Sequence, residues 1–165
     1  MGQFARDRRV LLWELYNEPG NSGKLTSSLP LLKKIFSWAR EINPEQALSV
    51  GLWNWNFKEF NEFQALNSDI ITYHDYQVPQ IHKSIINLLA THGRPLICTE
   101  YMARTLNSRF SNIFPMLQKE NVGAINWGFV SGKKNTIYAW DKPLLDGGQP
   151  VEWFHDIFNQ VGTTY

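Results

Sequence analysis

Short apolar runs alternate with stretches of helical periodicity along most of the chain. Five of these runs have the length and composition of β-strands, and they lie at residues 10–16, 48–52, 70–73, 96–99 and 124–127. Apolar residues are nearly continuous within each run instead of alternating with polar ones. This is typical of parallel strands that are covered on both faces. The pattern therefore predicts five parallel strands.

Four helical patterns lie between the runs. The first can be capped by Ser27 or Ser28 and ends at Asn43-Pro44. The fourth, at residues 110–119, contains Pro115, which predicts a late start or a kink. The apolar residues spaced for one helical face are Leu32, Ile35, Ala39 and Ile42 in the first pattern, Phe57, Phe60, Phe63 and Leu66 in the second, and Ile81, Ile85, Leu88 and Leu89 in the third, which runs from about Pro79 to Gly93.

Strands and helices alternate from the first run to the last, with no low-complexity linker between them. Such alternation predicts an α/β fold with a parallel sheet and right-handed crossovers, which fits either an open sheet or a barrel. The strands start roughly 22–38 residues apart, and a (β/α)8 barrel of ~250 residues averages about 31 residues per unit. At that spacing 165 residues hold about five units, so a barrel would be incomplete.

Composition and charge disfavour some classes of binding partner. The formal net charge is +1 and the basic residues are scattered, so no tract predicts nucleic-acid binding. No apolar run approaches the ~20 residues of a membrane span, and the N-terminal residues lack a signal-peptide cleavage site. The single cysteine, Cys98, excludes an internal disulfide.

Aromatic residues make up 14% of the chain, and seven of them are tryptophans. A packed core accounts for most of the phenylalanines. Tryptophan beside Asn or Gly in a loop is different, because a flat ring with a polar edge suits stacking on a sugar. Trp53 and Trp55 alternate with asparagines, and each of them either stacks on substrate or packs inward. Trp127 precedes a glycine and is a further candidate platform.

In parallel α/β folds, functional groups gather where the strands end. The polar and aromatic residues at the predicted strand ends are Asn17, Glu18, Trp53, Trp55, His74, Tyr76, Glu100 and Trp127. Two facing carboxylates such as Glu18 and Glu100 suit cleavage of a glycosidic bond. One, when protonated, donates to the leaving oxygen, while the other, when ionised, attacks the anomeric carbon or activates water.

The stretches WELYNEP, HDY, LICTEY and INWGF stand in this order at the strand ends. Together they resemble the clan A glycoside hydrolases, the (β/α)8 superfamily that contains cellulases, mannanases, xylanases and β-galactosidases. The later stretch TIYAWDKPLLDGGQPVEWFHDIF is similar to bacterial members described as β-xylanase or cellulase-like. The resemblance runs from residue 10 to about residue 165. It implies that residues 1–165 form a single domain, a partial (β/α)8 TIM barrel with approximately strands four to eight.

The resemblance also implies a role for each matched residue. Glu18 would be the acid/base, and Asn17 would bind the 2-hydroxyl of the sugar. Glu100 would be the nucleophile. Tyr76, in a His-x-Tyr motif with His74, would hydrogen-bond the nucleophile.

By the same resemblance, Trp127 would form the floor of the −1 sugar site. The implied activity is retaining hydrolysis of β-linked bonds in a plant-type polysaccharide or oligosaccharide, without cofactor or metal. Secretion or a periplasmic location is expected of the family.

Strands one to three of the family barrel have no counterpart here, so a second copy of the chain or a missing N-terminal half is an expected partner. The alternative is an inactive half-barrel that binds sugar weakly or self-associates.

Two other site classes are disfavoured. Residues 128–133 resemble a phosphate-binding loop, but they are one residue too short between the glycines and lack Ser or Thr after the first lysine. No Gly-rich loop follows the first strand, which argues against a nucleotide-binding sheet. His82, His92 and His155 show no metal-ligand spacing, so no metal site is expected.

Overall fold

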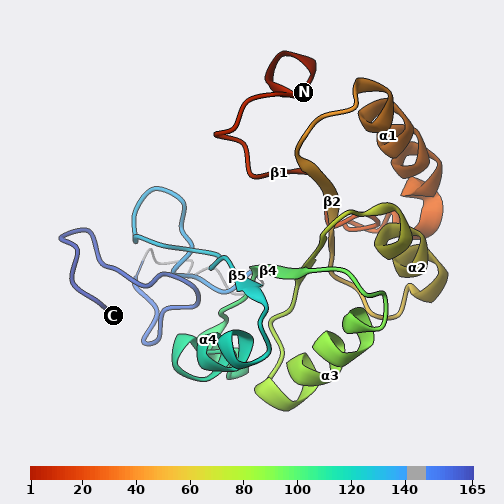
Figure 1. Ribbon diagram of the computed structural model, residues 1–165. Coiled ribbons are helices and arrows are strands. Elements are labelled where there is room, and N and C mark those ends of the chain that lie inside the picture. The colour runs from red at the N-terminus through yellow and green to blue at the C-terminus, as the bar shows by residue number, and fades with distance from the viewer. Residues whose placement is uncertain (141–147) are drawn as a thin grey trace. The chain divides into compact units, whose positions relative to one another are not determined.

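The computed structural model describes residues 1–140 and 148–165. Its helices and strands can be followed by label and colour in Figure 1. The predicted α/β class is confirmed, since five parallel strands form one sheet in the order β1-β2-β3-β4-β5, with helices between strands. The segment DKPLLDG of the family-like C-terminal stretch, residues 141–147, lies outside the described residues.

The element boundaries follow the hydrophobic pattern closely. The strands are β1 (Leu12–Asn17), β2 (Ala47–Leu52), β3 (Ile71–His74), β4 (Leu96–Glu100) and β5 (Gly123–Ala124). The helices are α1 (Leu29–Ile42), α2 (Lys58–Asn67), α3 (Pro79–Ala90) and α4 (Phe110–Lys119). Short 3-10 helices lie at Gly2–Phe4, Leu25–Ser28 and Arg104–Leu106.

The last strand, β5, is shorter than predicted. It ends at Ala124, although the N–H of Ile125 still donates to the Cys98 carbonyl oxygen of β4 at 2.8 Å. The Asn126 amide donates to the carbonyls of Trp127 and Gly128, and Gly128 has a φ of +85°. Side-chain bonds to nearby backbone compete with strand pairing, so the apolar run ends in a turn.

The ends of helix α1 agree with the prediction, but the Ser28 hydroxyl donates to the Leu25 carbonyl oxygen at 3.2 Å and does not cap the helix. It begins directly after Ser28 and ends before Asn43, which adopts a left-handed conformation with a φ of +50°. Helix α4 begins at Phe110, so the late start expected from Pro115 is wrong. The Asn112 side-chain oxygen accepts the N–H of Arg109 at 2.9 Å and stabilises that start, and Pro115 is exposed to solvent within the helix.

The buried stripe of α3 is rotated from the predicted one. His82, Ile85, Ile86 and Leu89 are buried, at the i, i+3, i+4, i+7 spacing of one helical face. Ile81 and Leu88, which were expected on that face, are 47% and 55% exposed. His82 occupies a core position although it is polar. The packing of α3 against its neighbours decides which face of the helix is buried, and the hydropathy of the single residue does not.

Adjacent leucines in α1 give a stability prediction. Leu32 is fully buried, whereas Leu31 is 47% exposed. Leu32→Ala should lower the free energy of unfolding by about 2–5 kcal/mol, because it leaves a cavity as well as losing apolar burial. Leu31→Ala should lower it by less than about 1 kcal/mol. Urea unfolding followed by circular dichroism measures both, and equal losses would contradict this orientation of the helix.

The chain divides into two compact units. The first consists of Met1–His74 and Asn87–Ile97, and the second of Asp75–Ile86 and Cys98–Tyr165. Fully buried residues of the first unit include Leu32, Leu48, Leu52 and Ile71, and those of the second include Ile113 and Leu117. The single domain expected for residues 1–165 stays a prediction.

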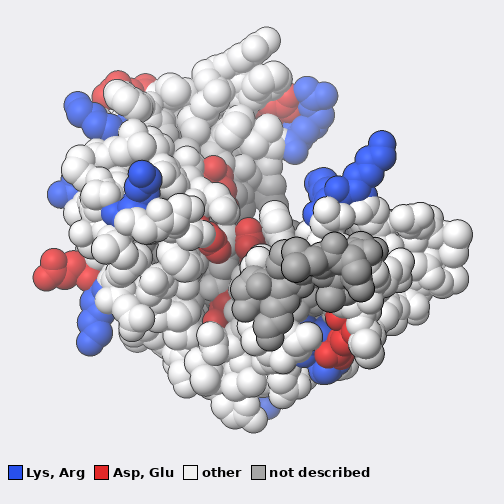
Figure 2. All heavy atoms as spheres, turned by 180° about the vertical axis from the view of Figure 1, so that it is seen from behind, with Lys and Arg blue, Asp and Glu red and all other residues white. Residues whose placement is uncertain are grey.

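The basic side chains are scattered in the structure, as they are along the sequence. On the face shown in Figure 2, the described Lys and Arg side chains stand in small separate groups and form no continuous patch. None of the helices in residues 1–140 and 148–165 has the length and apolar character needed to cross a membrane.

Candidate functional site

Glu18 directly follows β1 and has an unusual backbone conformation. Its φ is +46°, a region that residues other than glycine rarely adopt, and it precedes Pro19. The Trp53 indole N–H donates to the Pro19 carbonyl oxygen at 2.9 Å and holds this bend. Trp53 therefore supports the loop that carries Glu18. Backbone strain of this kind is found most often at functional sites.

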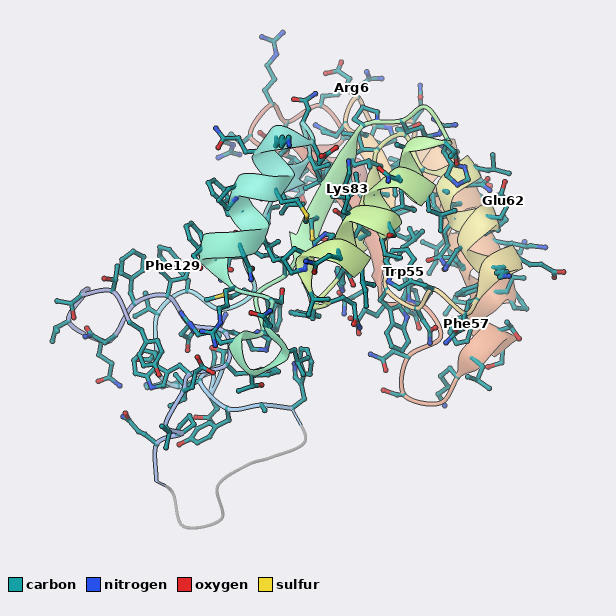
Figure 3. All side chains as sticks on the ribbon, turned by 90° about the horizontal axis from the view of Figure 1, so that it is seen from below. Arg6, Trp55, Phe57, Glu62, Lys83 and Phe129 are labelled. Carbon is teal, nitrogen blue, oxygen red and sulfur yellow. The ribbon has the colours of Figure 1, made fainter. Side chains whose placement is uncertain are left out.

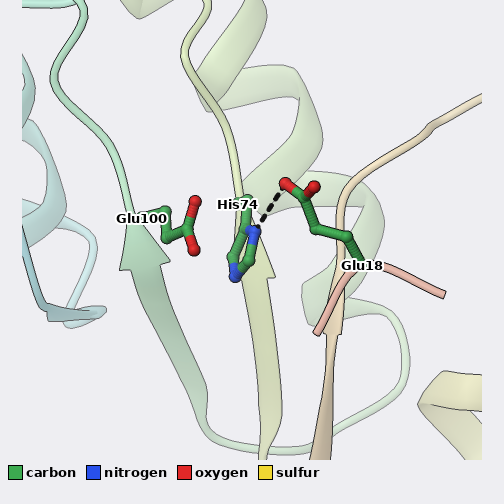
Figure 4. A group of neighbouring side chains, drawn as sticks. All are labelled: Glu18, His74 and Glu100. Carbon is green, nitrogen blue, oxygen red and sulfur yellow. Dashed lines mark hydrogen bonds and ion pairs between the residues drawn. The ribbon is translucent and has the colours of Figure 1, made fainter. Parts of the chain in front are cut away.

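Two side chains orient the Glu18 carboxylate within the first unit. Its Oε1 lies 2.9 Å from Nδ1 of His74, an interaction that Figure 4 marks with a dashed line. Its Oε2 accepts a hydrogen bond from the Asn21 amide. The Glu18 side chain is 17% exposed and the His74 side chain 2%. A carboxylate and an imidazole at this distance can exchange a proton, so the pair suits acid–base chemistry.

Gly51 provides the space that the His74 ring occupies. A Cβ atom at Gly51 would lie 2.9 Å from Nε2 of His74 and 3.3 Å from Oε1 of Glu14. Gly51 lies inside β2, opposite Asn17 of β1 in the strand register. Sequence reasoning missed this residue, although a glycine within an apolar strand is the signal that something approaches the backbone closely.

Glu100 is the last residue of β4, and Tyr76 holds its carboxylate within the second unit. The Tyr76 hydroxyl donates to Oε2 of Glu100 at 2.7 Å, which is the contact that the resemblance implied. The N–H of Asp75 donates to the Glu100 carbonyl oxygen at 3.0 Å and fixes the relative position of the two segments. Backbone pairing therefore brings the phenol to the carboxylate.

An aromatic cluster packs against Tyr76 in the second unit. The ring of Trp140 lies edge-on to Tyr76, with 4.7 Å between centroids, and the ring of His155 lies 5.5 Å away. His155 is buried and its Nδ1 lies 2.5 Å from the Met102 carbonyl oxygen; burial lowers the pKa of His155 to about 4. Sequence reasoning missed Trp140 and considered His155 only as a metal ligand, because neither follows a strand.

The remaining predicted residues present polar or aromatic surface. Asn17, the last residue of β1, is exposed, and Trp127, which follows β5, is 43% exposed. Trp55 packs edge-on against the buried Tyr73 with 6.2 Å between ring centroids, and it also lines a pocket of the first unit. The first unit thus holds Asn17, Glu18, Trp53, Trp55 and His74, and the second holds Tyr76, Glu100 and Trp127.

Metal-ligand donors are present in both units. The Glu18 carboxylate and the His74 ring offer one oxygen and one nitrogen donor in the first unit, and the Glu100 carboxylate offers a donor in the second. Within either unit taken alone, the described residues contain no group of three such donors.

Comparison of the chain with protein-family models and with curated proteins gives no match. Its function is therefore inferred from the chemistry of its side chains.

Proposed function

We propose that the protein is a retaining β-glycoside hydrolase with a partial (β/α)8 barrel, in which Glu18 is the acid/base and Glu100 the nucleophile. One observation supports this most. The end of β3 supplies a partner to each glutamate, His74 to Glu18 in the first unit and Tyr76 to Glu100 in the second. Both glutamates stand at the carboxyl ends of parallel strands of one sheet, where functional groups gather.

The partners suit two different tasks. A hydroxyl donor favours the ionised form of a carboxylate, and a nucleophile must be ionised to attack the anomeric carbon. Glu100 would bond to that carbon while the leaving oxygen takes the proton of Glu18. Water would then give a proton back to Glu18 and displace Glu100 from the sugar. His74, which can donate or accept a proton at Nδ1, suits a residue that changes between acid and base.

Substrate would be held by exposed groups at the same strand ends. Asn17 offers an amide that can donate to and accept from a sugar hydroxyl. Trp127 offers an exposed ring as the stacking platform. Trp53 contributes indirectly, because its indole N–H is engaged with the Pro19 carbonyl oxygen.

The test is hydrolysis of a panel of chromogenic β-glucosides, β-xylosides and β-mannosides, with the size of the protein measured under the same conditions. We expect turnover of at least one substrate, and Tyr76→Phe should lower kcat/KM by about 10- to 100-fold, because it removes a hydrogen bond to a charged group. Tyr138→Phe is the matched control, since the Tyr138 hydroxyl donates to the Gly148 carbonyl oxygen at 3.1 Å in the same unit. A folded protein with no turnover of any substrate would favour the inactive half-barrel instead.

A further inference from the structure

The first unit contains a pocket that involves neither glutamate of the proposed catalytic pair. Its volume is about 370 Å³, within the range of roughly 300–1,000 Å³ that is typical of small-molecule sites. Helix α2 and the end of α3 form it, together with Trp55 from the loop before α2. Figure 3 labels Trp55 on that loop and Glu62 on α2.

The wall of this pocket is apolar. Trp55 is half-buried, with the edge of its ring against the core residue Tyr73. Leu89 is buried beneath the pocket, whereas Leu88 is 55% exposed. An indole and a leucine therefore offer apolar surface to a ligand.

The rim of the pocket is polar and carries both signs of charge. Lys58 and Glu62 are exposed lining residues, and Nε2 of His92 lies 3.7 Å from Oε2 of Glu62. Glu62 disfavours an anionic ligand and Lys58 disfavours a cationic one. Donors and acceptors side by side instead suit hydroxyl groups, which donate and accept.

The loop that carries Trp55 is held in place by its own hydrogen bonds. The carbonyl oxygen of Asn54 accepts hydrogen bonds from the Asn61 amide at 2.8 Å and from the Phe57 N–H at 3.2 Å. The Asn54 side-chain oxygen accepts the N–H of Asn56 at 3.0 Å. A ring that is fixed in advance loses little conformational freedom on binding, so this geometry favours a binding site.

We propose that this pocket binds a neutral pyranose sugar, with the sugar ring stacked on Trp55 and its hydroxyls at the rim formed by Lys58, Glu62 and His92. The site would be a second sugar-binding site, formed by α2, the end of α3 and the loop that carries Trp55. Trp55 lines this pocket, whereas the indole N–H of Trp53 is bonded to the Pro19 carbonyl oxygen. Its occupancy does not depend on catalysis by Glu18 or Glu100.

The indole N–H signals in a ¹H–¹⁵N NMR spectrum test this assignment. The seven tryptophans give one such signal each, and Trp55→Phe, Trp38→Phe and Trp127→Phe identify three of them by deletion. On titration with cellobiose, xylobiose and mannobiose, the Trp55 signal should shift to saturation with at least one sugar. The signal of Trp38, whose ring is 53% exposed on α1, should not shift.

A pair of matched variants tests the apolar wall. Leu88→Asp should weaken the sugar affinity reported by the Trp55 signal at least tenfold, because it places a charge against the stacked ring. Leu66→Asp, at a leucine of α2 that is 57% exposed and does not line the pocket, should change it less than twofold. Equal effects of the two variants would overturn the assignment.

Other outcomes separate this inference from the proposed function. A Trp55 signal that no sugar moves, or that benzoate moves and sugars do not, overturns the pyranose site. If the Trp127 signal alone responds to sugar, the pocket assignment fails while the proposed function stands. If the Trp55 signal responds and the protein hydrolyses no glycoside, the pocket assignment stands without the proposed activity.

Discussion

Glu100→Ala is expected to lower kcat on chromogenic β-glycosides by at least about 10⁴-fold, because it removes the nucleophile and leaves no group to form the glycosyl-enzyme bond. The side chain is half-buried at the end of β4. Initial rates of release of the chromogenic leaving group measure the effect. Circular dichroism and urea unfolding show whether the variant is still folded.

Added azide or formate should partly restore turnover in Glu100→Ala, since a small anion can occupy the space of the missing carboxylate and attack the anomeric carbon. The product with azide should be a glycosyl azide of inverted configuration. Glu152→Ala is the control: this carboxylate of the second unit pairs with Arg109 at 2.7 Å and is not among the proposed catalytic residues. Undiminished activity in Glu100→Ala would exclude Glu100 as the nucleophile.

Glu18→Gln is expected to affect substrates according to their leaving groups. When the substrate is a disaccharide, its second sugar leaves as an alkoxide unless the leaving oxygen is protonated, so kcat/KM should fall by about 10²- to 10⁴-fold. A dinitrophenyl glycoside needs no proton on its leaving oxygen, and its kcat/KM should fall less than about 10-fold. Parallel assays of sugar release and dinitrophenolate release measure the two effects.

The control for Glu18→Gln is Glu45→Gln. Glu45 is an exposed carboxylate of the first unit that pairs with Arg6 at 2.8 Å, and its substitution should leave both substrates unaffected. If Glu18→Gln lowers kcat/KM equally for both substrates, Glu18 does not protonate the leaving group. Glu18 would then serve binding or the position of His74.

The structure contains the one contact that the resemblance implied, between Tyr76 and Glu100, and adds a second, between His74 and Glu18. The sequence places Glu18, His74, Tyr76 and Glu100 at strand ends, because strand ends can be recognised from apolar runs followed by polar residues. The structure adds which atoms are joined: Nδ1 of His74 with Oε1 of Glu18, and the Tyr76 hydroxyl with Oε2 of Glu100. The pattern of residues along the sequence identifies such residues but does not give the distances between their side-chain atoms.

The residues that sequence reasoning missed owe their importance to contacts with distant parts of the chain. The local sequence pattern says little about such contacts. Gly51 matters because the His74 ring, far from it along the chain, lies where its Cβ would stand. Trp140 and His155 matter because the C-terminal segment packs beside Tyr76. Trp53 and Trp55 have nearly the same local sequence, yet one indole bonds Pro19 and the other lines a pocket.

The sequence by itself determined the order of the helices and strands, the α/β class and the boundaries of four strands within two residues. Hydrophobic periodicity suffices for this, because the spacing of apolar residues shows whether a segment is a helix with one buried face or a strand buried on both faces. The tertiary structure decided the rotated stripe of α3 and the left-handed backbone of Glu18. Each of these depends on contacts between segments distant in sequence, and such contacts form only when the chain is folded.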